Sequence, residues 1–447
     1  QLKQTFEDSD PLNRVAGVVI DVNTGAVKGM GVYPNFDLNN PYKLDADSQF
    51  KLDLSGFEPG SLEYNTYFNE LLYSLWRNKA VSELYEPGST SKIITTAMAL
   101  EEDVVEWDDE FFCSSGGYVV IPGTSPVHCH RRSGHGRVFY REGLQQSCNP
   151  TLMQVAERIG RATFYNYFKS FGYTEKSGID LPGEASPIYH AYENFNALEL
   201  AICSFGQTYK VTPLQQVTNV ATIANGGKLL TPYVVEQIID DDGNILFQHT
   251  TDVRRQVVSE DVCRQIAEVL EEGVSGNGGA KNAYVPGYKI AAKTGTSEVR
   301  DILNEAGESF LRLGSTVAFA PADDPQIAIA VYVEKGGHGS TVASIAKAML
   351  DVYFEVGEIG EFVIMDGQNL NGQDSCIFSA VNGNCSHRYA GWHLSVRRPG
   401  NRSSRKPCNN RRSSGNTCRF CNKLNGLYEK SRRIRHPIKR RSARRFL

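Results

Sequence analysis

The sequence lacks any run of roughly 18 consecutive apolar residues, the length that a membrane-spanning helix needs. Its first residues, Gln1-Leu2-Lys3-Gln4, lack the basic segment and apolar core of a signal peptide. An exported form of the protein is therefore expected to carry a signal or anchor that this sequence does not contain. No internal repeat is present. With 40% hydrophobic and 22% charged residues among 447, the composition excludes a wholly disordered, collagen-like or coiled-coil chain.

Cysteine is too sparse for a disulfide-stabilised scaffold, since ten residues are spread over 447. Ten is nevertheless more than we expect of an exported protein that uses neither a metal nor redox chemistry. Cys148 lies between Ser147 and Asn149, and Cys203 lies beside Ser204; each is predicted to be a small buried side chain rather than a nucleophile.

The hydrophobic pattern predicts a mixed α/β chain. A hairpin is expected from Val15–Asp21 and Val27–Tyr33, around the turn Asn23-Thr24-Gly25. Helices are predicted at 89–102, at 141–159 with a break near Asn149-Pro150, at 213–224, at 259–274 and at 342–353. Strands are predicted at 288–293, 316–319 and 326–333. The hairpin and the late strands are expected to share one sheet that carries the last helix on its face.

The first chemical motif is Ser89-Thr90-Ser91-Lys92 at a helix start. Positions three apart lie on one face of a helix, so the Lys92 amine is expected beside the Ser89 hydroxyl. A serine hydroxyl becomes a nucleophile only when a base takes its proton, and burial lowers the pKa of a lysine into that role. Alone, the pattern is also typical of an N-cap serine followed by a solvated lysine.

Two further motifs lie downstream. Ser147-Cys148-Asn149 offers a hydroxyl to relay protons and an amide to hold a peptide, although a polar turn at a helix break has the same composition. Lys293-Thr294-Gly295-Thr296 follows an apolar strand and is more specific. It places a cation and hydroxyls at a sheet edge, where Gly295 is expected to let a substrate backbone approach.

Together, the order and surroundings of these motifs resemble the transpeptidase domain of class B penicillin-binding proteins, closest to the sporulation and elongation types of Gram-positive anaerobes. The resemblance covers about residues 10–357. The matching stretches are residues 85–92, 146–150, 178–184, 204–207, 212–215, 224–227 and 291–298. It implies the penicillin-recognising, β-lactamase-like fold: an antiparallel sheet flanked by helices, with an all-helical portion that holds the second motif.

The resemblance also implies roles for individual residues. Ser89 is expected to be the nucleophile and Lys92 its general base, while Ser147 relays the proton and Asn149 holds the substrate amide. Lys293 is expected to support this network electrostatically. Thr294 and Thr296 are expected to meet the substrate carboxylate, and the backbone amides of Ser89 and Thr296 to form the oxyanion hole. Ser91 departs from the family, which usually has a bulky apolar residue there.

A second group of residues suits a metal. Two cysteines and three histidines lie within residues 113–135, a spacing that fits a tetrahedral zinc site, a Cys113–Cys129 disulfide, or no ligand at all. The resemblance favours zinc, because related anaerobe proteins carry it near the active site. The expected ligands are Cys113, Cys129 and His135, with His130, His128 or Asp109 as the fourth and His130 preferred. The role is structural, and catalysis is expected to need no cofactor.

Charge divides the chain into two parts. After Gly360 there are 19 Lys and Arg against 4 Asp and Glu, whereas the preceding part has 28 against 47. We therefore expect a transpeptidase domain at 1–360 and a separate basic tail at 361–447. The tail is interpreted as disordered, as a binder of anionic wall polymers or nucleic acid, or as a non-native translation product.

The function expected from the resemblance is peptidoglycan cross-linking through an acyl-enzyme on Ser89. The expected partners are stem peptides, β-lactam antibiotics and a membrane glycan polymerase; nucleic acid is not expected. The location would be extracytoplasmic, on an anchor that this chain lacks. The alternatives are a D,D-carboxypeptidase or β-lactamase of the same fold, and a catalytically silent scaffold or sensor.

Overall fold

A computed structural model describes residues 2–9, 14–298, 312–334, 339–356, 388–389 and 392–393. All of them belong to one compact unit, Gln1–Arg397, and the second unit, Arg398–Leu447, contains no described residue. The predicted basic tail, 361–447, therefore lies outside the described residues except for the paired strands β12 (Arg388–Tyr389) and β13 (Trp392–His393).

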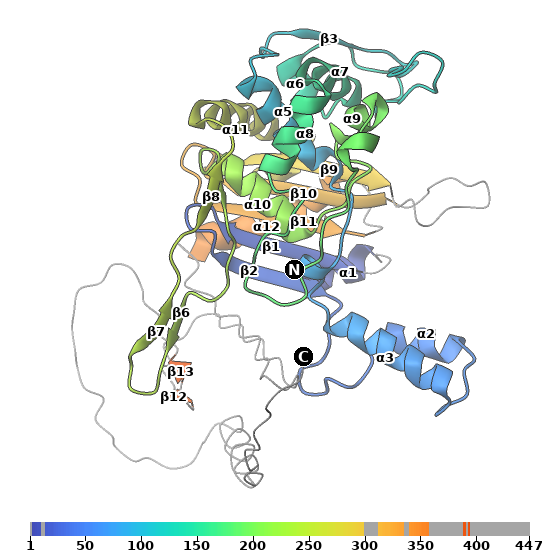
Figure 1. Ribbon diagram of the computed structural model, residues 1–447, viewed down its shortest axis with the longest axis vertical. Helices are drawn as coiled ribbons and strands as arrows, with labels where there is room; N and C mark the ends of the chain where they lie inside the picture. Colours follow the sequence, from blue (N-terminus) through green and yellow to red (C-terminus); the bar gives the residue numbers. More distant parts are fainter. Residues whose placement is uncertain are drawn as a thin grey trace, which may run out of the picture. The chain divides into compact units, whose positions relative to one another are not determined.

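A five-stranded antiparallel sheet is at the centre of the unit (Figure 1). The predicted hairpin is confirmed as β1 (Val15–Asp21) and β2 (Val27–Tyr33). The predicted late strands are confirmed as β9 (Ala291–Glu298), β10 (Arg312–Ala320) and β11 (Ile327–Val333), of which β9 begins later than expected. The strand order is β2-β1-β11-β10-β9, so the first and last parts of the domain pair side by side and β9 forms an edge.

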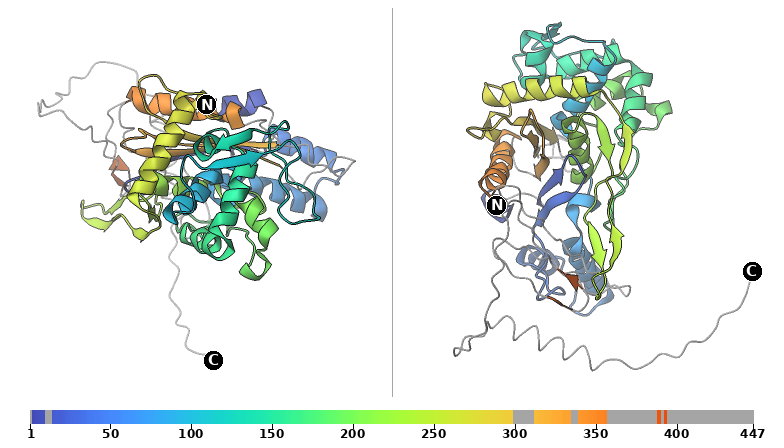
Figure 2. Two further views of the ribbon diagram at one scale, coloured as in Figure 1. Left: turned by 90° about the horizontal axis from the view of Figure 1, so that it is seen from above. Right: turned by 90° about the vertical axis from the view of Figure 1, so that its left-hand side faces the viewer.

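The two faces of the sheet belong to two different cores. Val18 and Ile20 of β1 point into one hydrophobic cluster, and Val15 and Val19 point into the other, as the alternation along a strand requires. Helix α10 (Pro213–Ala224) packs on the first face. Helix α12 (Gly339–Val356), the predicted last helix, covers the second face together with α1 (Leu2–Ser9). The right-hand view of Figure 2 shows orange α12 and green α10 on opposite sides of the strands.

Most of the remaining helices gather into the expected all-helical portion, around α7 (Figure 1). The predicted helix at 141–159 is broken as expected, because Pro150 has no amide hydrogen and fits only the first turn of a new helix. The elements are η1 (Gly88–Ser91), α5 (Lys92–Glu101), α6 (Tyr140–Gln145), α7 (Asn149–Ile159), α8 (Arg161–Ser170), η2 (Tyr192–Asn194), α9 (Ala197–Cys203) and α11 (Glu260–Ser275). Strands β3 (Glu110–Cys113) and β4 (Gly136–Phe139) pair beside α7.

Several elements were not predicted from the sequence. Helices α2 (Ala46–Leu54) and α3 (Leu62–Trp76) form a hairpin that packs on itself around Leu52, Leu72 and Leu75. Further unpredicted elements are α4 (Lys79–Ser82), β5 (Lys228–Leu230), β6 (Gln237–Ile239), β7 (Ile245–Gln248), β8 (Val253–Gln256) and η3 (Lys281–Ala283), together with α1, α8, η2 and α9 above. Among the helices of the described ranges, none is both long and apolar enough to cross a membrane.

Every residue of helix α10 is buried. The backbone amides at its N-terminus therefore need hydrogen-bond acceptors from the protein, and the N-terminal cap supplies them. The Thr212 hydroxyl accepts a hydrogen bond from the Gln215 amide at 3.1 Å, and the Gln215 side chain accepts one from the Thr212 amide at 3.0 Å. We predict that Thr212→Ala lowers the free energy of unfolding by about 1 to 2 kcal/mol, because a buried amide loses its acceptor. Urea denaturation measures this; Thr212→Ser, which keeps the acceptor, is the control, and equal losses in both variants would contradict the assignment.

Candidate active site

The turn that carries Ser89 is held by close backbone packing. Gly88 has a φ of +56° and donates its amide hydrogen to the Gly206 carbonyl at 2.8 Å. A Cβ atom on Gly206 would lie 2.0 Å from the Gly88 carbonyl oxygen, so only glycine fits there. The turn continues from η1 into α5, which leaves the Ser89 side chain half exposed at the helix start and Lys92 fully buried.

Lys92 lies among acceptors that come from the second motif. Its Nζ atom is 2.6 Å from the Ser147 carbonyl oxygen, 2.6 Å from Asn149 Oδ1 and 3.1 Å from Ser147 Oγ. Burial lowers the pKa of Lys92 to about 8, and the thiols of Cys148, Cys129 and Cys113 offset part of that shift. A neutral amine donates to the two carbonyl-type oxygens and keeps a lone pair for a hydroxyl proton, so Lys92 is suited to act as a base.

Ser147 occupies a strained position between two helices. Its φ is +59°, a region that residues with a side chain rarely adopt. The conformation is held by backbone hydrogen bonds from Ser147 to Leu144 and from Cys148 to Gly143, at 3.1 and 2.8 Å. Strain of this kind persists where the surroundings enforce it, and here it turns Ser147 Oγ and Asn149 Oδ1 toward the same lysine.

Lys293 reaches the same hydroxyl from the sheet. Its Nζ atom donates to Ser147 Oγ at 2.9 Å and to the Thr294 carbonyl at 2.9 Å. Burial lowers the pKa of Lys293 well below its ordinary value, and the neighbouring charge of Lys92 lowers it further. Ser147 Oγ thus lies between two buried lysine nitrogens, an arrangement that can pass a proton from one side of the site to the other.

The structure shows a packing reason for a glycine at position 295, in addition to the expected substrate role. A Cβ atom at this position would lie 2.5 Å from Ser315 Oγ, 3.0 Å from the Pro87 carbonyl and 3.0 Å from Thr90 Cγ2. The space beside its Cα is therefore filled by the nucleophile turn and by β10. Glycine at this position allows β9 to approach that turn closely.

The two threonines of the third motif are oriented by neighbouring backbone. Thr296 Oγ1 accepts a hydrogen bond from the Gly339 amide at 3.0 Å, which leaves its own hydroxyl proton available to an anion. Thr294 is buried, and its Oγ1 lies 3.5 Å from the Gly279 carbonyl oxygen. The structure thus brings the three motifs together at the junction of β9, η1 and the α6–α7 break.

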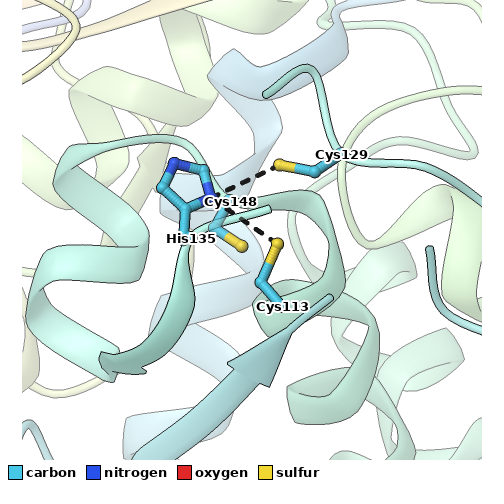
Figure 3. A group of neighbouring side chains, drawn as sticks. All are labelled: Cys113, Cys129, His135 and Cys148. Atoms are coloured by element: carbon cyan, nitrogen blue, oxygen red, sulfur yellow. Dashed lines mark hydrogen bonds between the residues drawn. The ribbon is translucent and has the colours of Figure 1, made fainter. Parts of the chain in front are cut away.

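A cluster of three cysteines and one histidine lies directly behind the second motif. The potential ligand atoms of Cys113, Cys129, His135 and Cys148 are all within 4.8 Å of one another (Figure 3). His135 Nδ1 is 3.6 Å from Cys113 Sγ and 3.5 Å from Cys129 Sγ. Cys113 comes from β3 and Cys148 precedes α7, so the cluster ties the β3–β4 loop to the helical portion.

Three of the expected ligands are therefore neighbours, but the fourth position differs from the prediction. Cys148 completes the group, whereas it was expected only to be a small buried side chain. His130 lies 3.6 Å from Cys129 Sγ but is exposed and outside the group of four. Asp109 instead pairs with Arg158. The sequence signal that was missed is the position of a cysteine between two residues of an active-site motif.

Without a metal, the three cysteines of the cluster differ in protonation: the pKa of Cys129 is lowered, whereas those of Cys113 and Cys148 are raised. The Cys148 thiol donates to Cys129, which lowers the pKa of Cys129 and raises that of Cys148; contacts from His130 and the backbone amides of Arg131 and Asn149 lower the Cys129 pKa further. Burial lowers the pKa of His135, which favours the neutral imidazole. All five cysteines of the described ranges, including this group, have free thiols.

Comparison with known proteins agrees with this geometry. A family model described as "Penicillin binding protein transpeptidase domain" matches residues 15–351. Stage V sporulation protein D of Bacillus subtilis is 39% identical over 293 residues, which cover 63% of this chain and 44% of that protein. Peptidoglycan D,D-transpeptidase MrdA of Acinetobacter baumannii is 31% identical over 366 residues, 76% of this chain and 50% of that protein. The chain thus spans about half the length of these relatives.

Solved structures show the same fold. The D,D-transpeptidase domain of a peptidoglycan glycosyltransferase from Eggerthella lenta superposes with a TM-score of 0.64 at 25% identity, covering 80% of this chain and 81% of that one. Penicillin-binding protein 3 from Mycobacterium tuberculosis, solved with aztreonam, gives a TM-score of 0.65 at 22% identity, covering 79% and 75%. The expected penicillin-recognising fold, with its antiparallel sheet and flanking helices, is confirmed.

The lowered pKa of Lys92 leads to a pH prediction. If neutral Lys92 accepts the Ser89 proton, the second-order rate of acylation by a fluorescent penicillin follows the neutral fraction of Lys92. With a pKa of about 8, that rate rises about 50-fold from pH 6 to pH 8 and then levels off. Circular dichroism over the same range controls for unfolding. A flat profile, or a midpoint near the ordinary lysine pKa, would show that Lys92 is not the base.

Proposed function

The chain belongs to the penicillin-binding protein transpeptidase family, and from this membership we propose that it is a serine D,D-transpeptidase that cross-links peptidoglycan stem peptides. The observation that carries the proposal is the convergence of two buried lysines, Lys92 and Lys293, on the hydroxyl of Ser147 beside the turn of Ser89. A silent scaffold has no need of two buried lysine amines with lowered pKa values, whereas acyl transfer needs a base and a proton relay.

In the proposed acylation, Ser89 Oγ attacks the carbonyl carbon of the penultimate D-alanine and Lys92 takes its proton. The developing oxyanion accepts hydrogen bonds from the backbone amides of Ser89 and Thr296. The C–N bond to the terminal D-alanine then breaks, and the proton passes from Lys92 through Ser147 to the leaving amine. The ester on Ser89 is the acyl-enzyme. A neighbouring stem-peptide amine attacks this ester next, which forms the cross-link and returns the proton to Ser89.

Substrate binding is assigned to the third motif and to Asn149. The carboxylate of the terminal D-alanine would accept hydrogen bonds from the hydroxyls of Thr294 and Thr296, near the Lys293 charge. Support comes from the Thr296 contact with Gly339, which fixes the oxygen and leaves its proton for an acceptor. Asn149 is proposed to hold the stem-peptide amide. A β-lactam would enter the same site, and opening of its ring would esterify Ser89.

The proposed substrate, the stem peptide of peptidoglycan, lies outside the cytoplasm, and the enzyme has to be in the same compartment. We therefore propose an extracytoplasmic location, with a membrane anchor in the full-length protein. The proposed partners are the stem peptides, β-lactams and a membrane glycan polymerase, which makes the strands that are to be joined. The acyl transfer itself uses only the side chains and backbone amides described above.

The cysteine–histidine cluster is proposed to bind one structural zinc ion through Cys113, Cys129, His135 and Cys148. A tetrahedral zinc site has Zn–S bonds of about 2.3 Å and Zn–N bonds of about 2.0 to 2.1 Å. The distance between a sulfur ligand atom and a nitrogen ligand atom is then about 3.6 Å. In the structure, His135 Nδ1 lies 3.6 Å from Cys113 Sγ and 3.5 Å from Cys129 Sγ, which agrees with that value. The Cys129 thiolate and the neutral His135 imidazole are ready to bind zinc, whereas Cys113 and Cys148, whose pKa values are raised, would release their thiol protons when the ion binds.

Bound zinc would neutralise the thiolates and cross-link three distant segments of the chain. The position of Cys148 in the sequence connects the cluster to the active site. Cys148 lies between Ser147 and Asn149, so an anchored Cys148 Sγ restrains the strained turn that presents both groups to Lys92. The proposed role is therefore structural.

Intact-mass spectrometry after incubation with penicillin tests the proposed chemistry. We predict a stable adduct of one penicillin on the wild-type protein and none on Ser89→Ala, because the oxygen that forms the ester is then absent. Consumption of penicillin without an adduct would assign the protein to the β-lactamases instead. Intact penicillin and no adduct on a protein with a wild-type circular dichroism spectrum would support the silent scaffold.

Metal analysis of matched variants tests the zinc proposal. Native mass spectrometry is expected to find one zinc ion on the wild-type protein and on His130→Ala, and none on Cys148→Ser. The structural reason is that Cys148 belongs to the group of four and His130 does not. Loss of zinc in His130→Ala with retention in Cys148→Ser would restore the ligand set expected from the sequence, and no zinc in any form would refute the proposal.

A further inference from the structure

A hydrogen bond behind the nucleophile joins two residues that are far apart in the sequence. The Tyr209 hydroxyl donates to Ser91 Oγ at 2.6 Å, and both side chains are 2% exposed. Ser91 is two residues from the proposed nucleophile, Ser89, within the same short helical turn. A buried hydroxyl without a partner is costly, so this pair fixes the two side chains relative to each other.

Tyr209 ends a segment that follows the nucleophile turn closely. We name residues 206–209 the clamp segment. Its Gly206 carbonyl accepts from the Gly88 amide at 2.8 Å, and its Thr208 amide donates to Glu86 Oε1 at 3.2 Å. With the Tyr209 hydroxyl, the clamp segment bonds to the turn at three points, before and after Ser89. Thr208 has a φ of +66°, an unfavourable conformation that brings the segment against the turn.

The Tyr209 ring is itself held on two sides. Phe168 meets it edge to face at 4.9 Å between ring centroids, and Tyr173 does so at 5.3 Å. Burial raises the pKa of Tyr209 well above its ordinary value, so the hydroxyl remains a donor. Because the ring is held by the aromatic cluster, the hydrogen bond from the Tyr209 hydroxyl holds Ser91 in a fixed position relative to that cluster.

A second chain of hydrogen bonds supports the other side of the turn. Tyr173 donates to Gln216 Oε1 at 3.1 Å, Gln216 Nε2 donates to Thr90 Oγ1 at 3.1 Å, and Thr90 donates to the Pro87 carbonyl at 2.8 Å. Every member of this chain is buried. The turn is thus positioned from behind by side-chain hydrogen bonds at Thr90 and at Ser91, the second of which is the position where the family usually has a bulky apolar residue.

We propose that Tyr209 is a positioning residue for Ser89: by donating to Ser91 it fixes the nucleophile turn so that Ser89 Oγ faces the Lys92–Ser147 pair. The inference rests on the proposed acylation of Ser89. Small displacements of a reacting atom are expensive, since about 1 Å costs about a hundredfold in rate. The Tyr209 hydroxyl touches no substrate and acts only through the turn.

The test uses Tyr209→Phe, Ser91→Ala and the double variant that combines these two substitutions. Tyr165→Phe is the control with which they are compared. Tyr165 is the matched control, because it belongs to the same aromatic cluster and its hydroxyl donates to the His190 carbonyl at 3.0 Å, away from the turn. The measurements are the acylation rate at saturating fluorescent penicillin, the half-saturating concentration and the melting temperature. Rates are normalised to the titratable active sites.

We expect Tyr209→Phe to lower the saturated rate about tenfold while the half-saturating concentration stays within about twofold, because the turn moves and the substrate contacts do not. The double variant should be no slower than Ser91→Ala, since the two groups share one bond. A normal saturated rate in Tyr209→Phe, or an equal loss in Tyr165→Phe, would overturn the proposal.

Hydrogen exchange separates this proposal from the proposed function. Peptides that cover residues 86–92 should exchange faster in Tyr209→Phe than in Tyr165→Phe, whether or not penicillin reacts. If the wild-type protein is not acylated but exchange differs in this way, the proposed function fails and the positioning role stands. Equal exchange in the two variants overturns the positioning role.

Discussion

Two buried lysines that share one serine hydroxyl are the constraint on which the rest of the domain depends. Lys92 begins α5 and Lys293 lies on the edge strand β9, and their nitrogens are 3.1 and 2.9 Å from Ser147 Oγ. An ammonium ion that is removed from water is costly, so burial lowers the pKa of each lysine, and the charge of Lys92 lowers that of Lys293 further. The sheet and the helical portion must meet at this point for the pair to exist. Helix α11 packs against both β9 and α5, so ordinary apolar burial elsewhere offsets the electrostatic cost at the site.

The backbone around the two lysines is also tightly constrained. Gly206 and Gly295 each allow two segments to approach more closely than a Cβ atom permits, Gly88 adopts a positive φ, and Ser147 does so without being glycine. All four lie where the nucleophile turn, the β9 edge and the α6–α7 break converge. Crowding and strain concentrated at one place are stable only when the surrounding elements enforce them, and that same rigidity holds reacting groups in a productive geometry.

The sequence predicted the parts of the fold that follow a strong local rule. The hairpin, the buried strand β11 and helix α10 have clear apolar periodicity and caps, and the three motifs have fixed spacing. The α2–α3 hairpin was missed because its core consists of a few leucines that face each other rather than the domain. Cys148 is buried as predicted, but its place in the cluster was missed for a related reason: its neighbours Cys113 and His135 come from other segments, and only the fold brings them together. The packing of Gly295 against the nucleophile turn was missed because a sequence motif does not show which neighbour fills the space beside a glycine.

A catalytic motif specifies which atoms react, but not how they are held. In this chain the two halves of the site are held by different means. The Ser147–Asn149 turn is fixed through Cys148 in a thiol and imidazole cluster, whereas the Ser89 turn is fixed by the clamp segment and by buried hydroxyls. Lys92 connects them, because it begins the helix that follows Ser89 and bonds to the Ser147–Asn149 turn. Since these bonds have lengths of 2.6 Å and end on a turn with little freedom of its own, a shift of either half changes the alignment of Ser89 with its base. The residues that support the two turns are therefore under the same geometric constraint as the residues that react.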